Sequence, residues 1–379
     1  MREACVADFR EASRRRLPRV LFDYIDGGAY AEETLAANVA DLREVKLRQR
    51  VLRDVSNLSL ETRLFGQTLA MPLALGPVGM AGMYARRGEV QAARAARGAG
   101  VPFVLSTMGV CGLPEVAAGA GQAPWFQLYM SRDRGFMSEV LAQARELGSP
   151  VLVFTVDLPV LGARYRDARN GLIASTAGER LRQIADGLAH PAWLWDVQLT
   201  GGPHSLGVVA SQARDLKRLA DYFAWINNNF DPSITWKDID WIRARWDRPM
   251  LIKGVLDVAD AHAAVEAGAD GLVVSNHGGR QLDGAPSAIR ALPAIAEAVG
   301  DRTTVLMDGG VRSGIDVLKA LASGAKACLM GRAWAYALGA CGEAGVSRML
   351  EILRDELKVA MALTGCSDIS SASHELLAS

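Results

Sequence analysis

Short apolar runs recur along most of the chain, and each run ends on small or polar residues. These runs are continuous rather than alternating, which is typical of strands that are buried on both faces of a parallel sheet. Eight of them span residues 72–77, 103–107, 125–129, 151–157, 250–254, 271–277, 304–310 and 327–332. The hydrophobic pattern therefore predicts eight buried strands.

Alanine-rich segments with helical spacing separate most of these strands. They span residues 88–98, 113–118, 134–147, 236–246, 257–266, 288–299 and 313–323. Strands that alternate with helices pair in parallel through right-handed crossovers, and eight such units close a (β/α)8 barrel. We therefore expect an α/β fold of the TIM-barrel type, with a doubly wound sheet as the alternative.

Three segments fall outside this repeat. Residues 3–48 read as polar helices and predict a helical lead-in to the barrel. Residues 165–232, after the fourth strand, are far longer than the loops of about 2–6 residues that usually follow such strands. Residues 367–379 resemble an exposed tail. We expect residues 1–379 to form one domain, from which 165–232 extends as a lid or a membrane-contacting loop.

The long excursion at 165–232 contains an aromatic cluster, Trp193-Leu194-Trp195. These side chains could pack on the barrel or anchor the loop in an interface, and packing is slightly favoured. Between Arg166 and Asp231 there are seven acidic and seven basic residues, so the excursion has no polybasic membrane patch.

Composition narrows the classes of partner and compartment. The chain has 42 basic and 42 acidic residues, which removes the usual electrostatic reason to expect nucleic acid as a partner. The five cysteines are scattered, so they indicate neither a metal site nor a disulfide framework. The N-terminus lacks the apolar core of a signal peptide, and no apolar run is long enough to span a membrane. A cytoplasmic protein, with peripheral membrane attachment left open, fits these features.

In a TIM barrel the carboxyl ends of the strands meet at one mouth, where ligands bind. Polar and small residues stand at the ends of all eight predicted strands. They are Pro77, Gly79, Ser106, Thr107, Gln127, Tyr129, Thr155, Asp157, Lys253, Ser275, His277, Arg280, Asp308, Gly309, Gly310, Arg312, Gly331 and Arg332. Each alone could be structural, but together they predict a ligand-binding mouth.

The last two strand ends predict an anion site. Backbone N–H groups at Gly309, Gly310 and Gly331 stand beside Arg312 and Arg332, and barrels commonly bind phosphate after strands seven and eight. No GxGxxG motif follows a strand, which argues against a dinucleotide-binding unit. We therefore expect a phosphorylated cofactor or substrate.

The other strand ends suggest redox chemistry on a small acid. Ser106, Gln127, Thr155 and Lys253 offer hydrogen-bonding groups and one positive charge, which suit the pyrimidine edge of a flavin. Arg164 and Arg280 could hold a substrate carboxylate. His277 could act as a base, and Asp157 would favour its protonated form.

These motifs resemble those of one family over about residues 8–370. The segments Ser275-Asn-His-Gly-Gly-Arg-Gln281, Asp308-Gly-Gly-Val-Arg312, Gln127-Leu-Tyr129 and Thr155-Val-Asp157, with Tyr24 before Gly27-Gly28, closely resemble the FMN-dependent α-hydroxy-acid oxidases and dehydrogenases. Segments 47–50, 82–90, 162–167 and 229–234 look most like the bacterial respiratory L-lactate dehydrogenases within that family.

The resemblance implies roles for individual residues. Tyr24, Arg164 and Arg280 would bind the substrate carboxylate, and Tyr129 would bond its hydroxyl. His277 would take a proton, and Asp157 would stabilise the imidazolium. FMN would be held by Pro77, Val78, Gly79, Ser106, Gln127, Thr155, Lys253, Ser275, Asp308, Gly309, Gly310, Arg312, Gly331 and Arg332. No metal is implied.

The implied reaction is oxidation of an L-2-hydroxy acid, with L-lactate favoured, to the 2-oxo acid, with electrons passed to a quinone or similar acceptor. The resemblance also implies a homotetramer placed peripherally on the cytoplasmic side of the inner membrane. Segment 108–113 departs from the lactate-enzyme pattern, so an L-mandelate-type dehydrogenase and an oxygen-using oxidase are alternatives. A non-flavin phosphate-binding lyase or isomerase, with Lys253 forming a Schiff base, is the alternative from another class.

Overall fold

The computed structural model describes residues 2–172, 176–210 and 219–378. Its centre is a sheet of eight parallel strands, in the order β3-β10-β9-β8-β7-β6-β5-β4. The strands are β3 (Leu73–Leu75), β4 (Val104–Ser106), β5 (Trp125–Leu128), β6 (Leu152–Thr155), β7 (Met250–Val255), β8 (Gly271–Val274), β9 (Thr304–Asp308) and β10 (Ala327–Met330). A parallel bridge between Leu75 and Phe103 joins the two ends of this sheet and closes the barrel.

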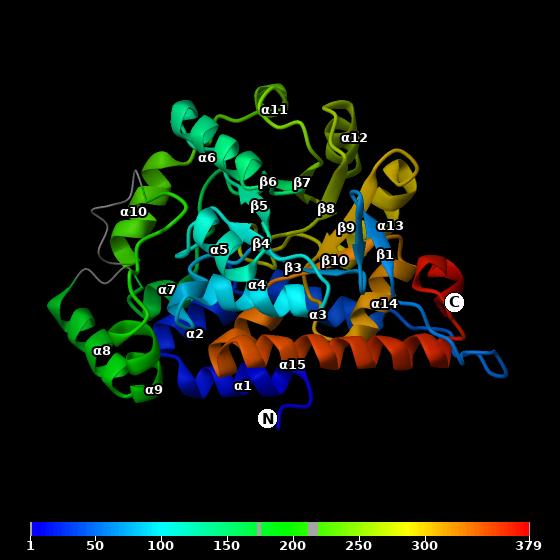
Figure 1. Cartoon of the computed structure of the whole chain (residues 1–379), viewed down its shortest axis with the longest axis horizontal. Helices are drawn as coiled ribbons and strands as arrows, with labels where there is room; N and C mark the ends of the chain where they lie inside the picture. Colours follow the sequence, from blue (N-terminus) through cyan, green and yellow to red (C-terminus); the bar gives the residue numbers. More distant parts are fainter. Residues whose placement is uncertain (1, 173–175, 211–218, 379) are drawn as a thin grey trace.

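Helices surround the barrel, as Figure 1 shows. They are α4 (Gly88–Gly98), α5 (Leu113–Ala120), α6 (Arg134–Glu146), α11 (Lys237–Arg243), α12 (Val258–Glu266), α13 (Ala288–Val299), α14 (Gly314–Ala322) and α15 (Arg332–Thr364). Every residue of β5, β6, β8 and β10 is buried, which explains why these runs are continuously apolar. The predicted TIM barrel is confirmed.

A short hairpin that the sequence pattern did not reveal fills the bottom of the barrel. Its strands β1 (Thr62–Leu64) and β2 (Gln67–Leu69) pair antiparallel, and Leu64 and Leu69 belong to the same buried cluster as the inward-facing strand residues. Phe65 at its turn lies edge-on to Trp125 at 5.9 Å between ring centres. The hairpin therefore seals the face opposite the predicted mouth.

The two ends of the chain pack against each other. The lead-in consists of α1 (Val6–Arg16), α2 (Arg19–Asp26) and α3 (Glu33–Glu44), and α1 runs beside α15 along the lower edge of Figure 1. Most residues in the described part of the expected exposed tail, 367–378, are exposed, but the tail is bonded to the rest of the chain. Ile369 is buried, and backbone hydrogen bonds join Ser59 to Ser367 and Arg48 to Leu376.

The excursion after β6 is mostly helical and lies at the left of Figure 1. It contains α7 (Tyr165–Arg169), α8 (Ala177–Leu188), α9 (Pro191–Trp193), the π-helix η2 (Leu194–Leu199) and α10 (Leu219–Asn229). Residues 173–175 and 211–218 of the excursion lie outside the described residues. Trp193 is buried and its indole N–H donates to the Met83 carbonyl at 2.8 Å, whereas Trp195 is exposed. Of the two expected placements, Trp193 therefore packs and Trp195 faces out.

Candidate functional site

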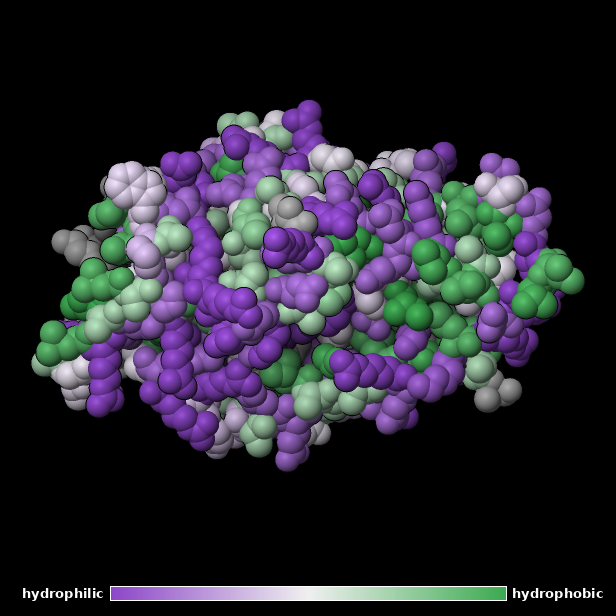
Figure 2. Space-filling view, turned by 90° about the horizontal axis from the view of Figure 1, so that it is seen from below, coloured by the Kyte–Doolittle hydropathy of each residue, from purple (hydrophilic) through white to green (hydrophobic). Residues whose placement is uncertain are grey.

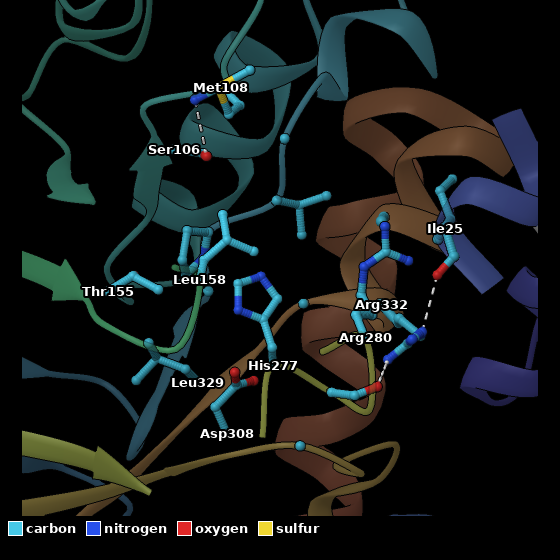
Figure 3. A pocket seen from close by; sticks show the side chains of 18 of the residues that line it. Ile25, Ser106, Met108, Thr155, Leu158, His277, Arg280, Asp308, Leu329 and Arg332 are labelled. Carbon is cyan, nitrogen blue, oxygen red and sulfur yellow. Dashed lines mark hydrogen bonds between the residues drawn. The ribbon is translucent and has the colours of Figure 1, made fainter. Parts of the chain in front are cut away.

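A cavity opens at the carboxyl ends of the strands, and Figure 3 shows part of its lining. Most of the predicted site residues line it. They are Tyr24, Pro77, Val78, Gly79, Ser106, Tyr129, Thr155, Arg164, Lys253, His277, Arg280, Asp308, Gly309, Gly310, Arg312, Gly331 and Arg332. Gln127, Asp157 and Ser275 lie behind this lining, and each is hydrogen-bonded to one of its residues. The structure therefore brings the predicted groups together at one mouth.

His277 stands between a carboxylate and a phenol. Its Nδ1 atom lies 2.8 Å from Oδ1 of Asp157, and its Nε2 atom lies 3.4 Å from the Tyr129 hydroxyl. Burial lowers the pKa of His277 below its ordinary value, although the Asp157 carboxylate opposes that shift. Burial would raise the pKa of Asp157, but the interactions with His277 and the positive charge of Lys253 together outweigh it, and the pKa is lowered. A neutral imidazole beside a charged carboxylate is the arrangement of a general base.

The backbone at His277 is in the left-handed region, with φ of 58°. Gly278 and Gly279 continue in this conformation with φ of 64° and 73°. For a residue with a β-carbon this conformation is strained, and such strain persists only where surrounding contacts hold it. Glycine is also required at position 279 for lack of space, because a β-carbon on Gly279 would lie 2.5 Å from the backbone nitrogen of Leu35.

Lys253 lines the cavity as part of a buried polar cluster. Its ammonium group is 2.8 Å from Oδ2 of Asp308 and donates to the Ser275 hydroxyl at 3.0 Å. Ser275 in turn donates to Asp308 at 2.9 Å. Burial opposes the charge on Lys253, but the carboxylates of Asp308 and Asp157 outweigh it, and the pKa of Lys253 is raised. The cavity therefore contains a fixed positive charge.

Two guanidinium groups share the ring of Tyr24. The guanidinium carbon of Arg280 lies 4.7 Å from the ring centre, and that of Arg164 lies 5.9 Å from it. Arg280 is held by the carbonyls of Tyr24 and Gly27, at 2.5 Å and 3.0 Å. Burial, together with the charge of Arg280, lowers the pKa of Arg164 to about 10. Two like charges in one pocket favour an anionic ligand such as a carboxylate.

Three glycines, Gly309, Gly310 and Gly331, also line the cavity. Gly309 and Gly310 have φ of 122° and 85°, and Gly331 precedes the first turn of α15. Among the described residues, three of the five N–H donors of Arg332 bind the carbonyls of Ile25, Gly27 and Gly278 at 2.7–3.0 Å, and two remain for a ligand such as the expected phosphate. Figure 3 shows the bond to Ile25. Arg332 thus ties α2 to the His277 loop.

Some buried polar atoms at the site have no protein partner among the described residues. They are Nε2 of Gln127, Oγ1 of Thr155 and Oδ2 of Asp157. The carbonyl oxygen of the Gln127 side chain accepts from Ser106 at 3.1 Å, which fixes the amide and leaves its N–H2 group without a partner in that set. Buried donors and acceptors of this kind are satisfied by a ligand or water. In the described part of the chain, no group of three His, Cys, Asp or Glu residues is placed to hold a metal ion.

The cavity has an apolar part, of which sequence reasoning identified only the segment that begins at Met108. Met108, Leu158 and Leu161 follow strand ends, while Ile226 and Phe230 come from the excursion. The ring of Phe230 lies 5.0 Å from that of Tyr129. The spacing of Ile226 and Phe230 places both on one helical face, but nothing in that pattern indicates which surface they meet.

Comparisons with known proteins agree with this arrangement. A family model described as FMN-dependent dehydrogenase matches residues 13–379. The chain is 59% identical over 371 residues to an L-lactate dehydrogenase of Caulobacter sp. (strain K31). This match covers 98% of this chain and 97% of the relative. The chain is 57% identical over 370 residues to an L-lactate dehydrogenase of Pseudomonas aeruginosa (strain LESB58), covering 98% and 97%.

Solved structures give the same family. The monotopic membrane protein (S)-mandelate dehydrogenase superimposes with a TM-score of 0.93 at 36% identity and full coverage of both chains (100% each). A mandelate oxidase gives a TM-score of 0.84 at 39% identity, covering 99% and 98%. The chain therefore belongs to the FMN-dependent dehydrogenase family, and its cofactor is FMN.

Proposed function

We propose that this protein oxidises an L-2-hydroxy acid to the 2-oxo acid and that L-lactate is its substrate. The observation that carries the proposal is one cavity lined by His277, Tyr129, Arg164 and Arg280, with Asp157 bonded to His277. These groups provide a base, a hydrogen-bonding partner for a hydroxyl group and a binding site for a carboxylate. Oxidation of a 2-hydroxy acid requires all three. The relatives named L-lactate dehydrogenase, at 57–59% identity, favour lactate over mandelate.

The residues around the cavity fit FMN, which supplies a two-electron acceptor when bound. Nε2 of Gln127 and Oγ1 of Thr155, which have no partner among the described residues, match the donors and acceptors of a flavin pyrimidine edge. Lys253 would stabilise negative charge on that edge. The backbone of Gly309, Gly310 and Gly331 would hold the phosphate. Further FMN contacts would come from Pro77, Val78, Gly79, Ser106, Ser275, Asp308, Arg312 and Arg332.

The substrate carboxylate would bind Arg164, Arg280 and the Tyr24 hydroxyl. The 2-hydroxyl group of the substrate would form a hydrogen bond with Tyr129. The Tyr129 phenol stays protonated at neutral pH, because burial raises its pKa well above the ordinary value. It can therefore donate to a substrate oxygen throughout the working range. Two guanidinium groups and two phenols would fix the acid in a single orientation at His277.

His277 would accept the proton at Nε2, because Nδ1 is bonded to Asp157. The Asp157 carboxylate would then stabilise the imidazolium and keep the ring in place. The same nitrogen serves whether the proton leaves the hydroxyl or the α-carbon. In either case the residue must begin neutral, which the lowered pKa of His277 favours.

We also propose that electrons pass to a quinone at the cytoplasmic side of the inner membrane, where the protein is peripheral. Helix α8 has no buried residue, and Leu181, Ile184 and Leu188 on its one face are each at least 60% exposed. Figure 2 shows hydrophobic residues gathered at the left end of the molecule, where α8 lies in Figure 1. No helix among the described residues is long and apolar enough to cross a bilayer. An exposed apolar helical face suits insertion into the membrane interface, and the related (S)-mandelate dehydrogenase is named a monotopic membrane protein.

We further propose that residues 1–379 form one domain and that the protein assembles as a homotetramer. Support for one domain comes from Tyr336 of α15, which donates to Asp26 of α2 at 2.7 Å, and from Arg332, which reaches Ile25. The tetramer rests on the family resemblance. A single calorimetric transition and a sedimentation mass of four chains are the expected results.

The reaction itself is tested on the purified holoenzyme. We expect a yellow protein whose flavin absorbance bleaches under anaerobic L-lactate, and more slowly under L-mandelate. Reoxidation should be faster with a ubiquinone analogue than with oxygen. A colourless protein that processes a phosphorylated substrate would favour the lyase or isomerase alternative, and a His277→Ala variant with unchanged turnover would remove the proposed mechanism.

A further inference from the structure

A buried pair of amide side chains joins helix α3 to the loop that carries His277. Nδ2 of Asn38 donates to Oδ1 of Asn276 at 2.8 Å, and Nδ2 of Asn276 donates to Oδ1 of Asn38 at 2.9 Å. Asn38 is 2% exposed and Asn276 is 5% exposed. At such burial, removal of one partner leaves the other amide without compensation for lost water.

Backbone groups fix the orientation of both amides. Nδ2 of Asn276 also donates to the Pro286 carbonyl at 2.9 Å, and the Ala288 N–H donates to Oδ1 of Asn38 at 3.2 Å. The Gly279 N–H donates to Oδ1 of Asn276 at 3.0 Å. All four hydrogen-bonding positions of the Asn276 side chain are therefore used, and a rotated amide would lose every one of them.

The bond to Gly279 bears on His277. The Gly279 N–H, the last of the left-handed run His277-Gly278-Gly279, is shared between the backbone carbonyl of Asn276 at 3.0 Å and its side-chain Oδ1 at 3.0 Å. The side chain therefore adds a second bond across the turn. The strained backbone of His277 needs such support. The same side chain that supports the turn is held in place by Asn38, 238 positions earlier in the chain.

We propose that Asn38 is a positioning residue for the reaction: it holds the Asn276 amide, which holds the left-handed turn that presents His277 to Asp157 and to the substrate. The inference rests on the proposed role of His277. Asn38 itself does not line the cavity. Its effect on the rate is therefore transmitted through Asn276.

The residues that bind substrate and FMN are held by contacts other than the Asn38 side chain. Substitution of Asn38 should therefore affect the reaction rate more than it affects binding. Arg280 follows the same turn, but its guanidinium is anchored on the carbonyls of Tyr24 and Gly27. Gly310 of the glycine loop packs on the Asn38 backbone carbonyl, which a side-chain substitution leaves in place. Gly309 lies against the Asn38 side chain, which Asn38→Ala shortens without adding an atom toward the loop. Substrate binding and FMN retention should therefore change less than the rate of proton transfer.

The test compares Asn38→Ala with the matched control Thr34→Val in the holoenzyme. Thr34 lies on the same helix, is equally buried, and donates to the Ala285 carbonyl at 3.1 Å, but it has no bond to Asn276 or His277. We expect Asn38→Ala to lower kcat about 10- to 100-fold, because a small misplacement of a reacting group has an effect of this size. Its KM and the FMN content should stay within about threefold of wild type, and Thr34→Val should leave kcat within about twofold.

Two results would overturn the inference. One is an Asn38→Ala enzyme with the kcat of Thr34→Val, and the other is a parallel loss of kcat and FMN content, which would mean a general structural role. If Asn38→Ala yields no folded holoenzyme, Asn38→Ser replaces it with the same expectation, and wild-type kcat in that variant also overturns the proposal. A wild-type enzyme inactive on all 2-hydroxy acids would instead refute the proposed function, so the two failures are distinguishable.

Discussion

The ring of Phe230 lies 5.0 Å from the ring of Tyr129, so the end of the long excursion covers the phenol at the tip of strand β5. A backbone bridge between Ser131 and Phe230 holds the two segments together. Phe230 and Ile226 thereby form a wall of the cavity that the barrel strands do not supply.

Removal of this wall should change the size of substrate that is accepted. In Phe230→Ala, we expect the ratio of kcat/KM for L-mandelate to kcat/KM for L-lactate to rise about 10-fold or more. The reason is that space for a few methylene groups in an apolar pocket changes substrate discrimination by about this factor. Trp225→Leu is the control, because Trp225 packs on Phe230 from outside the cavity. An unchanged ratio in Phe230→Ala would place the substrate side chain elsewhere.

The pH dependence of the reaction should report His277. Because burial lowers its pKa, the imidazole is neutral above its ordinary value of 6.5 and becomes protonated only at lower pH. We therefore expect kcat/KM to rise with pH along an acid limb below 6.5 and then to level off. An acid limb centred above pH 6.5 would show that burial does not dominate the pKa of His277 in solution.

Asp157→Asn should separate the two effects of the carboxylate. Without its charge the pKa of His277 falls further, so the acid limb should move to lower pH. The imidazolium that forms during the reaction loses its partner, and kcat should fall by about 10²-fold or more. Steady-state kinetics between pH 5 and pH 8, a range of about three units around the titration of histidine, measures both changes. A shift of the limb to higher pH would contradict the assignment.

Lys253→Met should slow reduction of the flavin more than it weakens substrate binding. The lysine is 2.8 Å from Asp308, so the substitution removes a positive charge and leaves that carboxylate without its ion-pair partner. We expect flavin reduction by L-lactate to slow by about 10²-fold, the usual cost of losing one electrostatic stabiliser, with a change in substrate affinity of about threefold or less. Anaerobic stopped-flow absorbance gives the rate and the affinity separately, and equal losses in both would argue against this role.

Membrane association should depend on one face of α8. A triple variant, Leu181→Ser, Ile184→Ser and Leu188→Ser, is expected to stay in the supernatant when wild type sediments with phosphatidylethanolamine–phosphatidylglycerol vesicles, because its apolar face is lost. The control is Val51→Ser with Leu52→Ser, two exposed apolar residues on a different segment. If both variants sediment as wild type does, α8 is not the membrane contact.

The amino-acid sequence by itself determined the repeating units and the chemistry at their ends. Continuous apolar runs between alanine-rich segments are local features, and they predicted the eight strands of the barrel and most of its helices. Polar residues at the ends of those runs had to meet at one mouth once the barrel closed. For this reason His277, Lys253 and Arg280 could be assigned to one site from their positions alone.

Only the tertiary structure decided which surfaces meet across long separations in the chain. The hairpin at Phe65 fills the barrel, Phe230 covers Tyr129, and Asn38 supports the His277 turn, yet each looks ordinary in its own segment. Arg332 was expected only as an FMN contact, yet it also donates to the carbonyls of Ile25, Gly27 and Gly278. Local periodicity indicates whether a residue is buried, but it does not indicate which residue it contacts. Those contacts form only when distant elements pack together, so they could not be predicted from the pattern.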